Sequence, residues 1–131
     1  MTAQRLDGRK LAKKIEHDLA PKVAALAREI GRPPRLVVVL VGDVAASASY
    51  VKSKASAAKR VGITADVFSI PASTTTAELV STVEAIGRDE HGPTDGILVQ
   101  LPLPDHVDAR AVLDAVPPDR DVDGFHAVNA G

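Results

Sequence analysis

The sequence contains no cysteine, which excludes a disulfide-stapled fold, a thiol nucleophile and cysteine metal ligands. Aromatic residues make up only 2% of the chain, so any core must be built from aliphatic side chains. The longest apolar run, Leu36–Val41, has the length of a strand and falls far short of the ~20 residues that a membrane-spanning helix needs. The N-terminal residues lack the apolar stretch of a secretory signal peptide. We therefore expect a cytoplasmic protein that does not enter a membrane.

Common ligand-binding motifs are also absent. The chain has no G-x-G-x-x-G dinucleotide fingerprint, no phosphate-binding P-loop and no H-E-x-x-H zinc motif. No metal site is expected, because the histidines are scattered at His17, His91, His106 and His126.

Charge is spread unevenly, although the net charge is only −1. Residues 1–70 hold 13 Lys and Arg against 6 Asp and Glu, a net of +7, whereas residues 71–131 hold 3 against 11, a net of −8. This polarity either draws an anionic ligand to one side of the molecule or, more simply, reflects solvated helix faces. Binding to nucleic acid is not expected, because the basic residues have no interleaved aromatic side chains for base stacking.

The 131 residues, 45% of them apolar, suffice for one domain with one core. An apolar residue at every third or fourth position predicts a first helix over residues 8–30, which Pro21 would kink or divide. Its apolar stripe consists of Leu11, Ile15, Leu19, Val23, Leu26 and Ile30.

Strands and helices then alternate. Runs rich in β-branched residues predict strands over residues 35–41, 63–70 and 96–100. Helices are predicted over residues 45–61, 76–88 and 108–116, the second of them capped by Thr74, Thr75 or Thr76. Such alternation forms parallel βαβ units with right-handed crossovers. We predict an α/β fold, a three-layer α/β/α domain with a mostly parallel sheet of three to four strands, whose ligands bind beyond the carboxyl ends of the strands.

Tyr50 and Lys54 lie four residues apart on the predicted second helix, and so on one face of it. An aromatic ring and an amine on one face can hold a flat ligand and place a proton-transfer group beside it. The spacing alone leaves a simpler alternative open, in which Lys54 is a solvated surface residue and Tyr50 packs half-buried.

Gln100 closes the third predicted strand, directly before Leu-Pro-Leu-Pro. At the carboxyl end of a central strand, its amide is placed to orient Lys54 or to bond a ligand heteroatom. The alternative is a polar strand end that meets water.

Asp121 and Asp123 stand in a segment with two prolines before them and a glycine after, which is typical of a loop. We expect the two carboxylates, which flank Val122, to point in opposite directions, so that only one faces a given pocket. That carboxylate could accept paired N–H bonds from a heterocycle. The alternative is turn chemistry, with one aspartate bonding its own backbone.

Together these segments resemble the methylenetetrahydrofolate dehydrogenase/cyclohydrolase family, the bifunctional folate enzymes. The similarity covers almost the whole chain, and its two long motifs are specific at this separation. It includes Asp7-Gly8, Val41-Gly42-Asp43, Ser47, Tyr50-Val51-x-x-Lys54, Val61-Gly62-Ile63, the run from Asp95 to Pro104, the run from Asp121 to His126, Asn129 and Gly131.

The resemblance implies two reactions. Members oxidise 5,10-methylenetetrahydrofolate to the 5,10-methenyl form by hydride transfer to NADP or NAD, and then hydrolyse it to 10-formyltetrahydrofolate. By position, the resemblance implies that Lys54 is the catalytic lysine, that Gln100 orients it, and that Asp123 binds the pterin. It further implies that Tyr50 stacks near the substrate rings and that the backbone from Val99 to Leu101 lines the cleft.

The chemistry agrees with these roles. The methenyl intermediate is a cation, so a protonated lysine beside it is repelled and a neutral amine able to handle water's proton is favoured. A neutral glutamine holds that amine without restoring its charge, and a carboxylate matches the donor edge of a pterin.

The chain departs from the family at a few positions. Val44-Ala45-Ala46-Ser47 stands where Asp-Pro-Ala-Ser is usual, Arg120 stands where lysine is usual, and Ala127 where proline is frequent. None of these departures removes a catalytic group.

The larger departure is length. Family members continue into a Rossmann-type domain that binds the nicotinamide cofactor. The resemblance therefore assigns residues 1–131 to the folate-binding catalytic domain, implies NADP as cofactor with its binding residues unknown, and implies a homodimer at full length. From these 131 residues alone we expect no dehydrogenase activity and at most residual cyclohydrolase activity.

Two competing readings are an isolated folate-binding domain without catalysis and a receiver-type signalling domain. The second is disfavoured, because only Asp43 follows the first strand and residues 71–131 contain no lysine.

Overall fold

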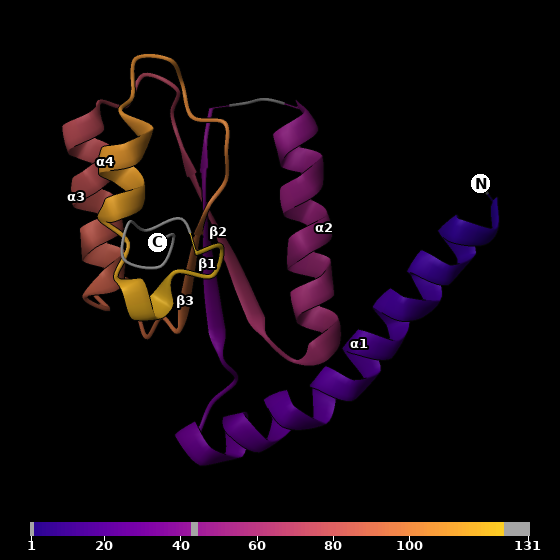
Figure 1. Ribbon diagram of the computed structural model, residues 1–131. Helices are drawn as coiled ribbons and strands as arrows, with labels where there is room; N and C mark the ends of the chain where they lie inside the picture. Colours follow the sequence, from indigo (N-terminus) through magenta and orange to yellow (C-terminus); the bar gives the residue numbers. More distant parts are fainter. Residues whose placement is uncertain (1, 43–44, 125–131) are drawn as a thin grey trace.

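The structure is a computed structural model that describes residues 2–42 and 45–124 (Figure 1). Several residues that carry the resemblance lie outside the described ranges, namely Asp43, Phe125, His126, Asn129 and Gly131. The described elements, in chain order, are α1 (Thr2–Ile30), β1 (Arg35–Val41), α2 (Ala45–Val61), β2 (Thr64–Ile70), α3 (Thr76–Gly87), β3 (Gly96–Val99), α4 (Ala109–Asp114) and a 3₁₀ helix (Pro118–Arg120).

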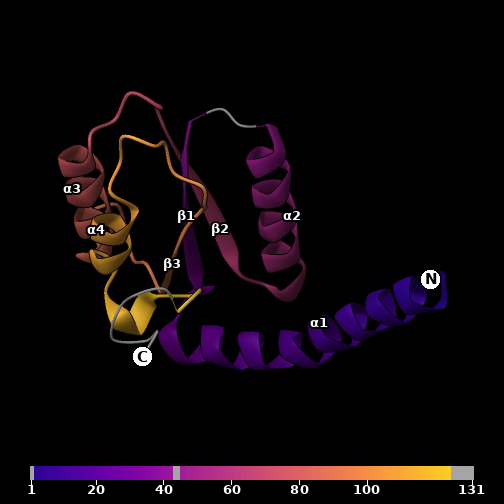
Figure 2. The ribbon, with the colours of Figure 1, turned by 45° about the horizontal axis from the view of Figure 1, so that its top comes forward.

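The three strands form one parallel sheet in the order β2-β1-β3. In this register Val38 of β1 lies opposite Val67 of β2 and Leu98 of β3. Helix α2 lies on one side of the sheet, and α3 and α4 lie on the other (Figures 1 and 2). The predicted three-layer α/β fold with a parallel sheet is therefore confirmed.

The core lies on both faces of β1, because alternate side chains of a strand point to opposite faces. Val37 and Val39 are fully buried and pack in the larger cluster, which contains Leu79 and Ile86 of α3. Val38, between them, packs on the other face with Val51 of α2 and with Leu98. A strand covered on both faces must be apolar at every position, which explains the uninterrupted run from Leu36 to Val41.

Helix α3 begins with a complete capping box. The Thr75 hydroxyl accepts a hydrogen bond from the Glu78 backbone N–H, and the Glu78 carboxylate accepts one from the Thr75 backbone N–H. Each bond satisfies an N–H group that the first turn of a helix leaves without an internal partner. Thr75 is thus the cap among the three candidate threonines.

Helix α1 differs from its prediction in two respects. It begins at Thr2 and continues through Pro21, so the proline does not divide it. Of its apolar stripe only Val23 is buried, while Leu11 and Ile15 remain 59% and 55% exposed. The N-terminal half of α1 projects away from the sheet (Figures 1 and 2), and the ion pair from Glu16 to Arg60 joins the helix to α2. Among the described residues, none of the helices is both long and apolar enough to cross a bilayer.

Candidate functional site

Gln100 follows the last residue of β3 and is held there by the sheet. Its backbone N–H donates to the Val39 carbonyl of β1 at 2.9 Å. Its side-chain amide donates through Nε2 to the Leu101 carbonyl at 2.9 Å. The bond leaves Oε1 as the acceptor of the amide, so the orientation of the amide is set locally, before any ligand arrives.

Lys54 reaches the same point from α2. Val51 and Ala58 of this helix are buried against the sheet, whereas Lys54 is exposed. Its Nζ donates to Gln100 Oε1 at 3.1 Å, across 46 residues of sequence. The amine is therefore held by a neutral acceptor, and one of its three possible hydrogen bonds is used for this contact.

Asp123 lies on a segment that runs parallel to β3 at the edge of the sheet. Asp121 forms an isolated parallel bridge with Ile97, and the Val122 N–H donates to the Ile97 carbonyl at 3.4 Å. The two aspartates differ in their contacts. Asp121 Oδ1 accepts a hydrogen bond from the Gly124 N–H at 3.1 Å, which is turn chemistry, whereas Asp123 lines a cavity.

That cavity has a volume of about 240 Å³ and lies at the carboxyl end of β3. It brings an amine, a carboxamide and a carboxylate together beside backbone and apolar groups. Its lining residues are Lys54, Val99, Gln100, Leu101 and Asp123. Such a site can hold a flat polar heterocycle by its donor edge and place an amine next to a reacting carbon.

Tyr50 is not among the residues that line this cavity. Its side chain is 65% exposed, one turn before Lys54 on the same helix. The structure therefore brings together five of the six residues proposed from sequence to bind substrate, and leaves Tyr50 at the surface beside them.

A larger cavity of about 510 Å³ lies elsewhere, between the other side of α2 and the start of β2. Its polar side chains are Lys52, Ser56, Lys59 and Thr64, and it contains no carboxylate or carboxamide. The larger cavity is therefore not the one that combines an amine, a carboxamide and a carboxylate. We place the candidate site at the smaller cavity, because acid–base work requires groups of different kinds within contact distance.

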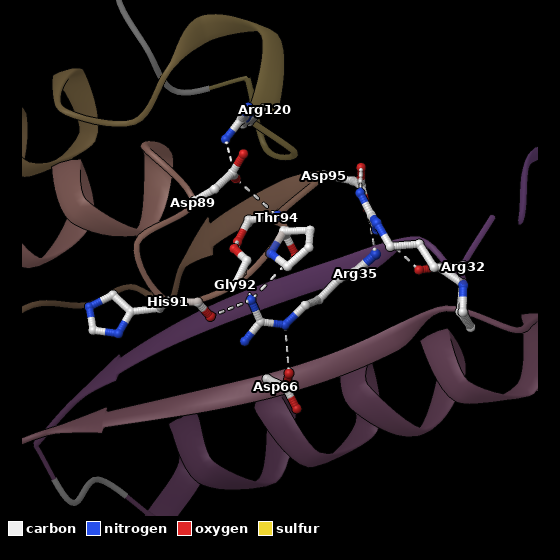
Figure 3. Close-up of polar contacts among 11 residues, drawn as sticks. Arg32, Arg35, Asp66, Asp89, His91, Gly92, Thr94, Asp95 and Arg120 are labelled. Atoms are coloured by element: carbon white, nitrogen blue, oxygen red, sulfur yellow. Dashed lines mark hydrogen bonds and ion pairs between the residues drawn. The ribbon is translucent and has the colours of Figure 1, made fainter. Parts of the chain in front are cut away.

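The amino ends of the strands carry a polar network that the sequence did not reveal (Figure 3). Arg35 Nε donates to Asp66 at 2.7 Å, and Arg35 Nη1 donates to the His91 carbonyl at 2.9 Å. Asp95 accepts two bonds from Arg32, at 2.6 and 2.9 Å, and one from the Arg35 backbone N–H at 2.8 Å. The Arg32 hydrogen bonds, helped by the Arg35 N–H, hold the pKa of Asp95 below its ordinary value against an opposing effect of burial.

This network also holds the segment that leads to Asp123. Arg120 Nη1 donates to the Gly87 carbonyl at 2.5 Å and to Asp89 Oδ1 at 2.8 Å. The sequence alone identifies Arg120 only as a departure from the family pattern. Its partners lie more than 30 residues away in a turn, and no periodicity links them.

Within residues 2–42 and 45–124, no group of three or more histidine, aspartate or glutamate side chains could hold a metal ion.

Comparison with known families matches residues 6–123 to a family described as tetrahydrofolate dehydrogenase/cyclohydrolase, catalytic domain. A bifunctional protein FolD from Halothermothrix orenii is 48% identical over 126 residues, which is 96% of this chain and 44% of that protein.

Solved structures give the same result. The structure of the bifunctional enzyme FolD, methylenetetrahydrofolate dehydrogenase/cyclohydrolase, from Campylobacter jejuni superposes with a TM-score of 0.87 at 40% identity, covering 96% of this chain and 44% of that one. The Trypanosoma brucei enzyme, solved with NADP cofactor and inhibitor, superposes with a TM-score of 0.86 at 36% identity, covering 95% and 41%. The chain therefore spans less than half the length of the relatives that it matches.

Proposed function

The chain belongs to the tetrahydrofolate dehydrogenase/cyclohydrolase family, and from this premise we propose that its small cavity holds the reacting end of a reduced folate. The observation that carries the proposal is the shared cavity. Lys54, Gln100 and Asp123 are distant in sequence, come from three different segments, and line one space at the carboxyl edge of the sheet. Parallel α/β sheets bind their ligands at this edge.

Asp123 is the group that binds the pterin in this proposal. A pterin presents neighbouring N–H donors on one edge, and an ionised carboxylate accepts such a pair in a charge-assisted, bidentate arrangement. This contact orients the ring system and so directs its one-carbon unit toward Lys54.

Lys54 is the proton-transfer group. The 5,10-methenyl carbon is cationic, so a neighbouring ammonium is repelled and the neutral amine is favoured. A neutral amine can take a proton from attacking water, which opens the ring toward 10-formyltetrahydrofolate. Gln100 fixes the position of the amine through its 3.1 Å hydrogen bond without adding a negative charge that would favour the ammonium form.

Val99 and Leu101 supply the walls of the cavity, and Tyr50 is the side chain that would stack on the substrate from the exposed face of α2. Because its ring is free at the surface, stacking requires no rearrangement of the core.

For the whole protein we propose the dual activity of the relatives: oxidation of 5,10-methylenetetrahydrofolate with NADP, then hydrolysis of the methenyl product. These 131 residues supply the folate side of the reaction. We further propose that the full-length enzyme is a cytoplasmic homodimer that acts on tetrahydrofolate derivatives, with no nucleic acid or membrane partner.

The test is hydrolysis of 5,10-methenyltetrahydrofolate by the full-length protein, followed by the loss of its absorbance. The wild type should exceed the buffer rate, and Lys54→Met should return it to background. Lys59→Met is the matched control, an exposed lysine on the same helix outside the small cavity. Equal background rates for the wild type and Lys54→Met would favour a folate-binding domain without catalysis.

A further inference from the structure

The segment 117–124, called here the Asp123 segment, connects the two ends of the sheet. It begins with the 3₁₀ helix Pro118–Arg120 near the amino ends of the strands (Figure 1) and ends at Gly124, directly after the carboxylate that lines the cavity. Its backbone hydrogen bond to the sheet, from Val122 N–H to the Ile97 carbonyl, is long at 3.4 Å. A bond of that length is weak, so other contacts must fix the segment.

Arg120 supplies a stronger attachment. One nitrogen of its guanidinium donates to the Gly87 carbonyl at 2.5 Å and to Asp89 Oδ1 at 2.8 Å (Figure 3). Gly87 is the last residue of α3, where carbonyl groups lack helical partners and carry the negative end of the helix dipole. A cation is favoured at this position, and only 27% of the Arg120 side chain is exposed.

Asp89 is itself held in an uncommon conformation. Its φ of 61° lies in the left-handed region, the only such angle at a non-glycine residue in the described ranges. The Thr94 N–H donates to the same Oδ1 atom at 3.1 Å. A strained residue persists only where its surroundings hold it, and here the surroundings are the turn after α3 and the arginine of the Asp123 segment.

Two glycines let the segment approach closely. A Cβ atom at Gly87 would lie 2.8 Å from Pro117 Cγ, and one at Gly96 would lie 2.8 Å from Val122 Cγ2. Real Cβ atoms do not come so near, so the segment touches the end of α3 at Pro117 and the start of β3 at Val122. The second contact is made by the residue directly before the cavity carboxylate.

We propose that Arg120 is a positioning residue for Asp123, and that its bonds to the end of α3 place this carboxylate in the cavity. The inference rests on the proposed function, since it assigns the carboxylate to the pterin. Arg120 is not among the residues that line the cavity, so it acts through the segment. The three residues from Arg120 to Asp123 span about 10 Å when extended, so a fixed start leaves Asp123 little freedom.

The test compares Arg120→Met with the wild-type chain by two measurements. The first is the NMR order parameter of the Val122 and Gly124 backbone amides, expected to fall from the rigid range of about 0.85 to below about 0.6. The second is the affinity for tetrahydrofolate, expected to weaken about tenfold or more, because loss of a charge-assisted hydrogen bond to the pterin costs this much.

Three further variants make the result specific. Asp123→Asn should weaken binding on its own, and adding Arg120→Met to it should weaken binding no further. Arg120→Lys should recover part of the loss, because an ammonium can still bond one of the two acceptors. Arg88→Met should change neither measurement, since Arg88 forms its ion pairs with Glu84 and Glu90.

Unchanged order parameters at Val122 and Gly124 would overturn the proposal. The proposal would also be overturned if Arg120→Met weakened tetrahydrofolate binding equally in the wild type and in Asp123→Asn. That result indicates general destabilisation instead of positioning of Asp123. A wild-type chain that binds no tetrahydrofolate refutes the proposed function, and the order parameters then decide alone whether Arg120 fixes the segment.

Discussion

The polar side chains at the two ends of the sheet differ in their hydrogen-bond partners. At the amino end, Arg35 bonds a carboxylate, a hydroxyl and backbone carbonyl groups, and Asp95 accepts bonds from two arginines. At the carboxyl end, the hydrogen bond of Lys54 within residues 2–42 and 45–124 goes to Gln100, although Asp123 lines the same cavity. In the described ranges, the charged groups at the amino end bond one another, whereas the Lys54 amine at the carboxyl end bonds a neutral amide.

The difference separates stabilising groups from binding groups. A carboxylate or guanidinium with a full set of partners lowers the free energy of the folded state and has little left for a ligand. An amine with one neutral acceptor contributes little to folding and keeps donor and lone-pair capacity for chemistry. The sheet thus holds its loops at one edge and leaves reactive groups available at the other.

The largest effect is expected from substitution at the carboxyl end of the sheet. It should lower the activity and leave the stability of the fold unchanged. Lys54→Met is expected to lower the rate of methenyltetrahydrofolate hydrolysis by about 10²- to 10⁴-fold, the usual contribution of a general acid or base. Its free energy of unfolding, measured by urea denaturation, should stay within about 0.5 kcal/mol of the wild type, as for other surface substitutions. A large loss of stability would show that the two ends are not separate in function.

The reciprocal substitution at the amino end should act on stability. Arg35→Met removes a side chain that is 17% exposed and leaves the partners Asp66 and Thr94 without its bonds. We expect the free energy of unfolding to fall by about 2 kcal/mol, the cost of unsatisfied polar groups. Arg88→Met, an arginine that is 58% exposed, is the control and should cost less than about 1 kcal/mol. If Arg35→Met and Arg88→Met lowered the free energy of unfolding equally, the network at Arg35 would stabilise the fold no more than the surface ion pairs of Arg88.

The smallest expected effect is the loss of folding stability at low pH that results from protonation of Asp95. Because the folded state lowers the pKa of Asp95, its stabilisation is present above the ordinary carboxyl pKa and is lost as the pH falls through the lowered one. The side chains of Arg32 and Asp95 are 35% and 37% exposed, so solvent screening limits the effect to at most about 1 kcal/mol. Wild type and Asp95→Asn should therefore differ by that amount at pH 7 and converge below about pH 4. A difference that grows with acid would have the wrong sign.

Much of the fold follows from local sequence physics. The strand over residues 35–41 and the helix over residues 45–61 have the predicted bounds, because a continuous apolar run and a helical period are local signals. A threonine cap for α3 was also predicted, although the sequence left three candidates and the structure identifies Thr75. The course of α1 through Pro21 and the exposure of Leu11 were not, since they depend on what the helix packs against.

The candidate site divides in the same way. Lys54 and Gln100 could be brought together in advance, because parallel strands and their crossover helices meet at one edge of the sheet. The contacts of Arg120 with Gly87 and Asp89 could not, since they join a loop to a turn with no repeating pattern. The different contacts of Asp121 and Asp123 do not follow from strand alternation, because residues two apart in an extended segment lie on the same side, and an extended segment was the wrong reason for expecting opposite directions. The chain turns directly after the bridge between Asp121 and Ile97, where Asp121 accepts the Gly124 N–H while Asp123 lines the cavity.

The central claim is that the carboxyl-end cavity binds a reduced folate, and a titration of the chain with tetrahydrofolate, followed by backbone amide shifts, tests it most directly. The account predicts saturable shifts at Val99, Gln100, Leu101 and Asp123 that are lost in Asp123→Asn. Shifts confined to the larger cavity around Ser56, Ile63 and Ala65, or none at all, would contradict it.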